Sequence, residues 1–201
     1  MRLAQKLAQK DYDKKVLRST EQELNAIQKY LSNNPVRLPE EIFKALHVER
    51  QKLVMPIKET EEEYIKAWES VEYEGKKFYE DVPELYTAKR ERVRSKSEVI
   101  IADLLNKEDI PYRYEYPVDL NNFGVIYPDF TVLNVRKRKE FLWEHLGMMD
   151  DPFYAENAVR KIITYGQNEF IQGKNLLLTY ETKAKPLDPR QVLILIRNFL
   201  Q

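Results

Sequence analysis

Two acidic residues lie inside apolar, strand-like runs of this 201-residue chain, where a carboxylate is costly unless it is paired, hydrogen-bonded or bound to a cation. Asp129 follows Pro128 within residues 125–135, a run rich in β-branched and aromatic side chains. Glu144 directly follows the apolar residues 141–143. Carboxylate oxygens are the ligands that hard cations such as Mg²⁺ prefer. The two residues therefore suggest a metal site before they suggest a core.

The segment between the two runs is short and charged, Arg136-Lys137-Arg138-Lys139. A connection of this length predicts a hairpin turn between antiparallel strands. Such a hairpin would bring Asp129 and Glu144 onto neighbouring strands of one sheet.

Composition excludes several classes of site. Lys+Arg and Asp+Glu both number 33, so net charge provides no global attraction to nucleic acid or to anionic membranes. Without cysteine the chain has no disulfides, thiolate zinc sites or cysteine nucleophiles. Two histidines, His47 and His145, are too few for a histidine-rich metal centre. Because no apolar run reaches transmembrane or signal-peptide character, we expect a soluble cytoplasmic protein with no membrane partner.

The sequence changes in character near residue 90, which predicts two parts. Residues 1–90 are polar and helix-prone, and we expect them to form a helical accessory or oligomerisation region. The spacing of Leu24, Ile27 and Leu31 predicts a long amphipathic helix, whose apolar stripe would pack on the chain's own second helix or in a homodimer. Residues 91–201 carry nearly all the strand-like segments.

Local signals position the remaining elements of the first part. Pro39 follows Leu38 at an expected helix start, and Thr60-Glu61-Glu62-Glu63 is a capping box ahead of a third helix. Glu74-Gly75 suggests a small turn or hairpin, and residues 88–96 form a basic linker into the second part.

The second part has the order helix, three strands, helix, strand, helix. We expect these elements at residues 97–107, 112–118, 125–135, 140–146, 152–172, 175–181 and from Asp188-Pro189 onward. This order predicts an α/β fold in which a central meander is joined by a crossover to a further strand.

Residues 91–201 resemble the PD-(D/E)XK nuclease superfamily, which has the restriction-endonuclease-like fold. The resemblance rests on the element order and on Glu98 in the first helix, Pro128-Asp129 on the second strand and Glu144 on the third. More narrowly, residues 94–98 and 143–150 look like a group of uncharacterised bacterial and phage proteins. The resemblance implies an αβββαβα core and a metal-dependent endonuclease that hydrolyses DNA phosphodiesters with Mg²⁺, for which Mn²⁺ would substitute.

The resemblance also assigns roles to residues. Asp129 and Glu144 would bind the metal together with the main-chain carbonyl of His145. Glu98 would bind a second metal or orient a metal-bound water, although Ser95-x-x-Glu98 is also a capping box that explains Glu98 without metal.

The chain departs from the family at one position. A lysine usually lies two residues after the strand glutamate, but Leu146 occupies that position here. Lys161 on the following helix is the candidate replacement, with Tyr165 one turn later on the same face, and Arg160 is the alternative. If neither reaches the site, the chain is a catalytically degenerate nucleic-acid-binding or protein-interaction module with this fold.

Two basic clusters are the candidate contacts to nucleic-acid phosphates, and solvated turns are their alternative interpretation. They comprise Lys89, Arg90, Arg92, Arg94 and Lys96, and then Arg136, Lys137, Arg138 and Lys139.

Overall fold

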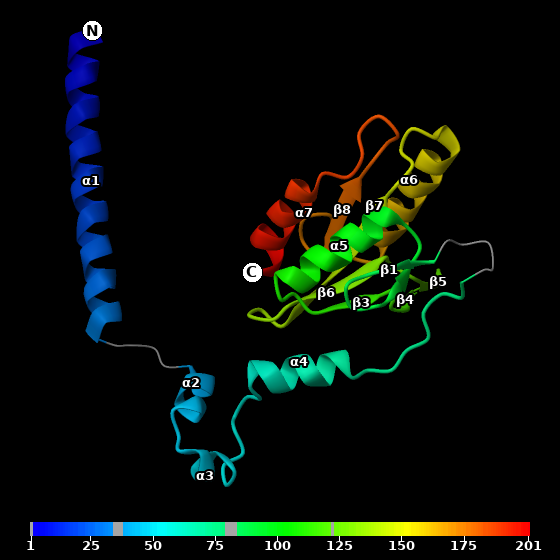
Figure 1. The fold of residues 1–201 in the computed structure, drawn as a ribbon. Coiled ribbons are helices and arrows are strands. Elements are labelled where there is room, and N and C mark those ends of the chain that lie inside the picture. Colours follow the sequence, from blue (N-terminus) through cyan, green and yellow to red (C-terminus); the bar gives the residue numbers. More distant parts are fainter. Residues whose placement is uncertain (1, 34–37, 79–83, 122) are drawn as a thin grey trace. The chain divides into compact units, whose positions relative to one another are not determined.

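The computed structural model describes residues 2–33, 38–78, 84–121 and 123–201 (Figure 1). The chain divides into two compact units, an N-terminal unit of residues 1–59 and a C-terminal unit of residues 60–201.

The N-terminal unit contains three helices: α1 (Arg2–Asn33), α2 (Pro39–Lys44) and α3 (Val48–Gln51). The long helix that the sequence predicts is confirmed, and Pro39 occupies the first turn of α2. Leu24, Ile27 and Leu31 of the apolar stripe on α1 are each more than half exposed. Self-association through this stripe stays a prediction.

The boundary between the two units in the sequence lies at residues 59–60 instead of near residue 90, because helix α4 packs with strands of the C-terminal unit. Helix α4 (Glu61–Glu69) starts with the predicted capping box on Thr60. Its Trp68 is buried and donates a hydrogen bond from Nε1 to Glu140. The guanidinium of Arg113 lies 4.0 Å from the centre of the Trp68 ring. These contacts join α4 to strands that follow far later in the sequence.

The basic stretch at residues 88–96 is a structured part of the C-terminal unit and not a linker. Strands β1 (Leu85–Tyr86) and β2 (Arg92–Val93) pair antiparallel, and Val93 is fully buried. The turn between them contains Arg90, whose φ is 63°. The hairpin expected at Glu74-Gly75 is not formed within the described residues 70–78, which contain neither helix nor strand.

Four strands form the central sheet of the C-terminal unit, in the order β3-β6-β7-β8. Pairing is antiparallel between β3 and β6 and between β6 and β7, whereas β7 and β8 are parallel. The strands are β3 (Tyr112–Tyr114), β6 (Phe130–Asn134), β7 (Lys139–Leu146) and β8 (Leu176–Tyr180). The α/β prediction is therefore confirmed.

Helices cover both faces of this sheet (Figure 1). The core on one face joins α5 (Lys96–Lys107) and α7 (Pro189–Leu195), with its π-helical extension Ile196–Leu200, to inward residues such as Phe130 and Trp143. The other face joins α6 (Pro152–Gln167) to Leu142, Leu176 and Leu178. Alternating residues of β7 therefore point to two different helical layers.

Two of the predicted strands are shorter than expected, and a small hairpin lies between them. The strand predicted over residues 112–118 breaks at Glu115, whose φ is 46°. Strands β4 (Val118–Leu120) and β5 (Gly124–Ile126) then pair with each other. Asp129 lies at a bend just before β6, not within a strand, because Pro128 has no N–H with which to continue the ladder.

The helices α6 and α7 start at the residues that the sequence predicts. Asp151 caps α6 and Asp188 caps α7, each followed by a proline at the first helical position. The helix predicted over residues 152–172 ends at Gln167. No helix in the described part of the chain combines the length and apolar character needed to cross a membrane.

Replacing Trp68 with alanine tests whether α4 belongs to the C-terminal unit. Because Trp68 is only 7% exposed and packs on Arg113, we expect Trp68→Ala to lower the free energy of unfolding by about 3 kcal/mol. Urea unfolding of the full chain measures this, with the fully buried Trp143 as the fluorescent reporter. Leu53→Ala, at a side chain that is 85% exposed, is the matched control and should change stability by no more than about 0.5 kcal/mol. Equal effects of the two substitutions would contradict the packing of α4.

Candidate metal centre

Asp129 and Glu144 lie opposite each other at one end of the β6–β7 hairpin. The register pairs Phe130 with Trp143, so the next pair outward is Asp129 and Glu144. Trp143 points to the layer of α5 and α7, and alternation turns Glu144 to the opposite layer, where α6 lies. The hairpin that the sequence predicted therefore brings the two carboxylates together beneath α6.

Asp129 is held by the backbone of β7. Its Oδ2 accepts a hydrogen bond of 2.6 Å from the N–H of His145. Burial raises the pKa of Asp129 well above its ordinary value, and the negative charge of Glu144 raises it further. The charge of Lys161 and the hydrogen bond from His145 act in the opposite direction. Ionisation of both carboxylates at once is therefore unfavourable without a further positive charge.

Glu144 is held by α6. The residue is only 3% exposed, and its Oε1 lies 2.6 Å from Nζ of Lys161 and accepts a hydrogen bond from the Tyr165 hydroxyl. Lys161 and Tyr165 are four residues apart, so they share one face of the helix. The buried Ala158 lies on the same face, three residues before Lys161. The prediction that Lys161 would approach this site from the following helix agrees with this geometry.

The electrostatics fix the protonation states of the two α6 side chains. Burial alone would lower the pKa of Lys161, but the charges of Glu144 and Asp129 outweigh it, so that pKa is raised above its ordinary value. Burial and the charge of Glu144 also raise the pKa of Tyr165. Lys161 is therefore a cation and Tyr165 a hydrogen-bond donor at neutral pH. The Lys161 side chain is 38% exposed, so the site is accessible from solvent along it.

The main chain of His145 provides a third oxygen. In an extended strand the N–H and C=O of one residue point to the same side. Because the N–H of His145 reaches Asp129, its carbonyl faces the same edge of β7. The imidazole lies on the opposite face, with Nδ1 3.0 Å from Oγ1 of Thr179 and Nε2 3.3 Å from Oε1 of Glu181. The side chain of His145 is thus engaged in packing between β7 and β8.

Glu98 has a full set of protein partners at the start of α5. One carboxylate oxygen accepts hydrogen bonds from the Arg94 N–H at 2.8 Å and from the Tyr114 hydroxyl at 2.7 Å. The other accepts from the Ser95 hydroxyl at 2.9 Å, and Ser95 in turn accepts from the Glu98 N–H at 3.1 Å. The capping interpretation that the sequence left open accounts for this buried carboxylate.

The donor set fits Mg²⁺ with two carboxylates and one carbonyl. Among the described residues, no group of three or more His, Cys, Asp and Glu side chains is placed to hold a metal ion. Mg²⁺ in phosphoryl-transfer sites typically uses one or two carboxylates and fills its other positions with water and phosphate oxygens. Asp129, Glu144 and the carbonyl of His145 are the groups that would hold it.

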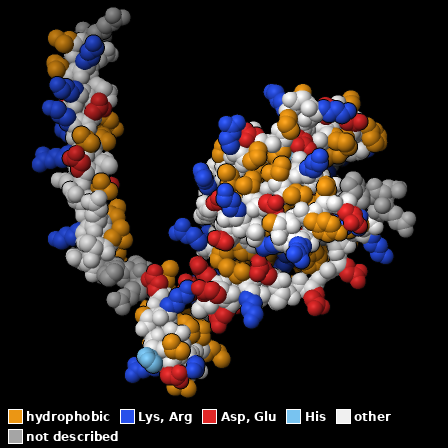
Figure 2. All heavy atoms as spheres, viewed as in Figure 1, with side chains coloured by type: hydrophobic (Ala, Val, Ile, Leu, Met, Phe, Trp, Pro, Cys, Tyr) orange, Lys and Arg blue, Asp and Glu red, His pale blue; other side chains and the backbone are white. Residues whose placement is uncertain are grey.

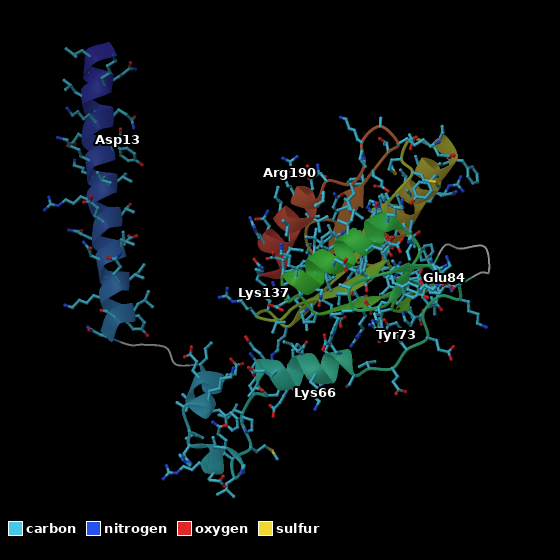
Figure 3. All side chains as sticks on the ribbon, viewed as in Figure 1. Asp13, Lys66, Tyr73, Glu84, Lys137 and Arg190 are labelled. Atoms are coloured by element: carbon cyan, nitrogen blue, oxygen red, sulfur yellow. The ribbon has the colours of Figure 1, made fainter. Side chains whose placement is uncertain are left out.

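The cluster Arg136–Lys139 lies at the far end of the hairpin from the carboxylates. Glu144 comes five positions after Lys139 along β7, a distance of about 17 Å in an extended strand. Lys137, labelled in Figure 3, lies at the end of the C-terminal unit away from α6. Arg138 packs over the ring of Tyr64, and the Lys139 amine donates to the Lys174 carbonyl. The structure does not bring this cluster to the carboxylate pair.

The cluster Lys89–Lys96 lies mostly in contacts within the C-terminal unit. Lys89 lies over Tyr112, and Arg92 lies over Phe78. Arg94 forms an ion pair with Glu115 at 2.6 Å. Lys96, by contrast, is exposed in the first turn of α5.

Tyr154 lies near the site and was not identified from the sequence as a site residue. The Tyr154 hydroxyl accepts a hydrogen bond from the Gly147 N–H at 3.2 Å, and burial raises its pKa, as do the charges of Asp129 and Glu144. Tyr154 and Lys161 are seven residues apart on the helix that Asp151 caps, so they lie near one face of it. This spacing was the sequence signal that could have identified Tyr154.

Glu181 links three parts of the C-terminal unit. Its Oε2 accepts from the Ser97 hydroxyl at 2.8 Å and from the Leu187 N–H at 2.9 Å. Burial would raise its pKa, but these hydrogen bonds and His145 lower it below its ordinary value. The local sequence does not indicate the links to Ser97 and His145, because both residues are distant along the chain.

Comparison with known proteins gives one significant similarity. No protein-family model matches the chain. An 88-residue segment, 43% of this chain, is 36% identical to the "Uncharacterized protein MJ1519" of Methanocaldococcus jannaschii. The segment covers 7% of that protein, so the chain matches only a small part of this relative.

Removing the charge of Lys161 tests the electrostatic account of the site. Lys161→Met leaves Glu144 and Asp129 without their cation, and we expect a loss of about 1–2 kcal/mol in unfolding free energy at pH 7 with EDTA. Adding Glu144→Gln should restore most of this loss. Arg160→Met, at an exposed pair with Glu156, is the matched control and should have little effect. Urea unfolding that shows no difference between the two single variants would contradict the account.

Proposed function

We propose that the protein is a Mg²⁺-dependent nuclease of the PD-(D/E)XK type that hydrolyses DNA phosphodiester bonds. The observation that carries this proposal is the pair of carboxylates at the end of the β6–β7 hairpin, with Lys161 beside Glu144 and the His145 N–H on Asp129. Two carboxylates this close repel each other, and among the described residues Lys161 is the cation that forms an ion pair with them. A bound divalent cation would supply the missing positive charge.

The arrangement of elements supports the same proposal. Apart from the β4–β5 hairpin, the order α5, β3, β6, β7, α6, β8, α7 follows the αβββαβα pattern that the resemblance implies. The sheet order β3-β6-β7-β8, with an antiparallel meander and a parallel last strand, agrees with that core. The hairpin β4–β5 is then an insertion between the first and second core strands.

Each protein group would have a defined task in hydrolysis. Mg²⁺ at this site would activate a water molecule and neutralise charge on the phosphate as the bond breaks. Asp129, Glu144 and the His145 carbonyl would hold the cation. The Tyr165 hydroxyl fixes the orientation of the Glu144 carboxylate, since it donates to Oε1.

Lys161 would take the task of the lysine that the family places two residues after the glutamate. Leu146 occupies that position and is buried, so it contributes only packing. The raised pKa of Lys161 keeps the ammonium protonated, and it therefore acts as a donor and a positive charge, not as a general base. A donor beside Glu144 is placed to orient the attacking water or to stabilise charge on the phosphate.

A second candidate function is a nucleic-acid-binding or protein-interaction module that keeps the fold without turnover. Leu146 in the lysine position favours it. The two candidates differ in one observable, because the module would show no metal-dependent cleavage even where it bound Mn²⁺.

Cleavage assays test the proposed nuclease. We expect the full chain to cut labelled DNA with Mg²⁺ or Mn²⁺, and Asp129→Ala or Glu144→Ala to reduce the rate at least about 100-fold, since each removes a metal ligand. Lys161→Ala should reduce it by a similar factor while leaving Mn²⁺ binding, measured by calorimetry, in place.

The control for these variants is Asp119→Asn, which neutralises an exposed acid on β4 and should leave the rate unchanged. Cleavage that persists in both Asp129→Ala and Glu144→Ala would contradict the nuclease assignment. Mn²⁺ binding that depends on both carboxylates, without any cleavage of double- or single-stranded DNA or of RNA, would favour the second candidate.

A further inference from the structure

The first half of α1 carries positively charged residues at every fourth position. Lys6, Lys10, Lys14 and Arg18, here called the cationic ridge, follow one another at this spacing along the helix. Each step of four residues rises about 6 Å, so the ridge extends over about 18 Å. All four side chains are exposed. Figure 2 shows Lys and Arg side chains projecting along α1.

The acidic residues of this half do not neutralise the ridge. Asp11 forms an ion pair with Lys15 at 2.8 Å, and Asp13 accepts a hydrogen bond from Gln9 at 2.7 Å. Within the described residues, no ion pair involves a member of the cationic ridge. Its charges are therefore available to a partner.

The positive charge is concentrated locally in a chain that is neutral overall. Residues 2–18 contain six Lys or Arg and two Asp, although the whole chain carries no net charge. This segregation supplies the local attraction to a polyanion that global composition does not.

The pattern of apolar residues on α1 favours a nucleic-acid backbone over an anionic membrane as the partner of the ridge. Leu3, Leu7 and Leu17 share one face of α1 with Lys10 and Lys14, because the positions 3, 7, 10, 14 and 17 follow helical spacing. A helix that lies on a membrane needs an apolar face separated from its charged face. A mixed face of cations and short apolar groups instead suits a sugar–phosphate backbone, where phosphates recur regularly and sugars lie between them.

We propose that the cationic ridge of α1 binds the sugar–phosphate backbone of nucleic acid. The proposal deepens the nuclease function and rests on it for the choice of nucleic acid as the polyanion. In this proposal the N-terminal unit binds the nucleic-acid backbone, and the carboxylate pair of the C-terminal unit binds the metal. The contacts that we propose are made to phosphates, which carry no sequence information, so we expect binding to be independent of sequence.

Metal-free binding tests the ridge separately from catalysis. Fluorescence anisotropy of a labelled 30-base-pair duplex, and of a single strand of the same length, is measured with the full chain in EDTA at several salt concentrations. We expect Lys6→Gln/Lys10→Gln to weaken duplex binding at least about tenfold at low salt and to reduce the slope of log K against log salt by about 2. Glutamine preserves helix propensity, and circular dichroism checks the helix.

The matched control removes the same charge from the same helix outside the ridge. Lys15→Gln/Lys29→Gln should leave the salt slope within about 0.5 of the unmodified chain. Equal weakening by both double variants would overturn the proposal, because net charge alone would then explain binding. Unchanged binding by the ridge variant would overturn it as well.

Two further measurements separate the alternatives. If vesicles containing anionic lipid bind in a ridge-dependent manner while the duplex does not, the ridge is a membrane contact and the proposal fails. If binding depends on the ridge but the chain never cleaves DNA, the ridge proposal stands and the nuclease assignment fails. Comparison of the duplex with the single strand shows which form of backbone the ridge holds.

Discussion

The structure of the C-terminal unit depends on how two carboxylates are tolerated at the end of a buried hairpin. The β6–β7 register places Asp129 opposite Glu144, and one lysine and one tyrosine from α6 meet the glutamate. A backbone N–H from β7 meets the aspartate. This arrangement depends on the β6–β7 register, because a shift of one residue would point the strand side chains to the other face. It also depends on the start of α6 at Pro152, which Asp151 caps. The excess negative charge that remains is the property from which the metal proposal follows.

The sequence predicted the structure correctly where the signals came from neighbouring residues. Apolar runs around a short charged turn predicted the carboxylate pair, and helix caps at Thr60 and Asp188 predicted two helix starts. The interpretation of residues 60–90 differed from the structure because Trp68 packs on Arg113 and Glu140, which follow more than 40 residues later. Glu98 could be interpreted both as a cap and as a ligand, and only the Tyr114 hydroxyl and the Arg94 N–H show how its carboxylate is used. A sequence shows which residue types could form a site. Only the tertiary structure shows which hydrogen-bond partners those side chains have.

The two compact units carry different kinds of charge. The C-terminal unit concentrates buried acids at one point, and the first half of α1 concentrates exposed cations along one side. A polyanionic substrate would be attracted by the second and would need a divalent cation to approach the first. If the proposed function holds, this separation lets a chain with no net charge attract a polyanion locally.

Anomalous diffraction from crystals soaked in Mn²⁺ tests whether Asp129 and Glu144 form a metal site. We expect one anomalous peak at about 2.1 Å from a carboxylate oxygen of each residue and from the His145 carbonyl, with Lys161 still beside the site. A map without a peak there, in which Glu144 keeps only Lys161 and Tyr165 as partners at saturating Mn²⁺, would contradict it.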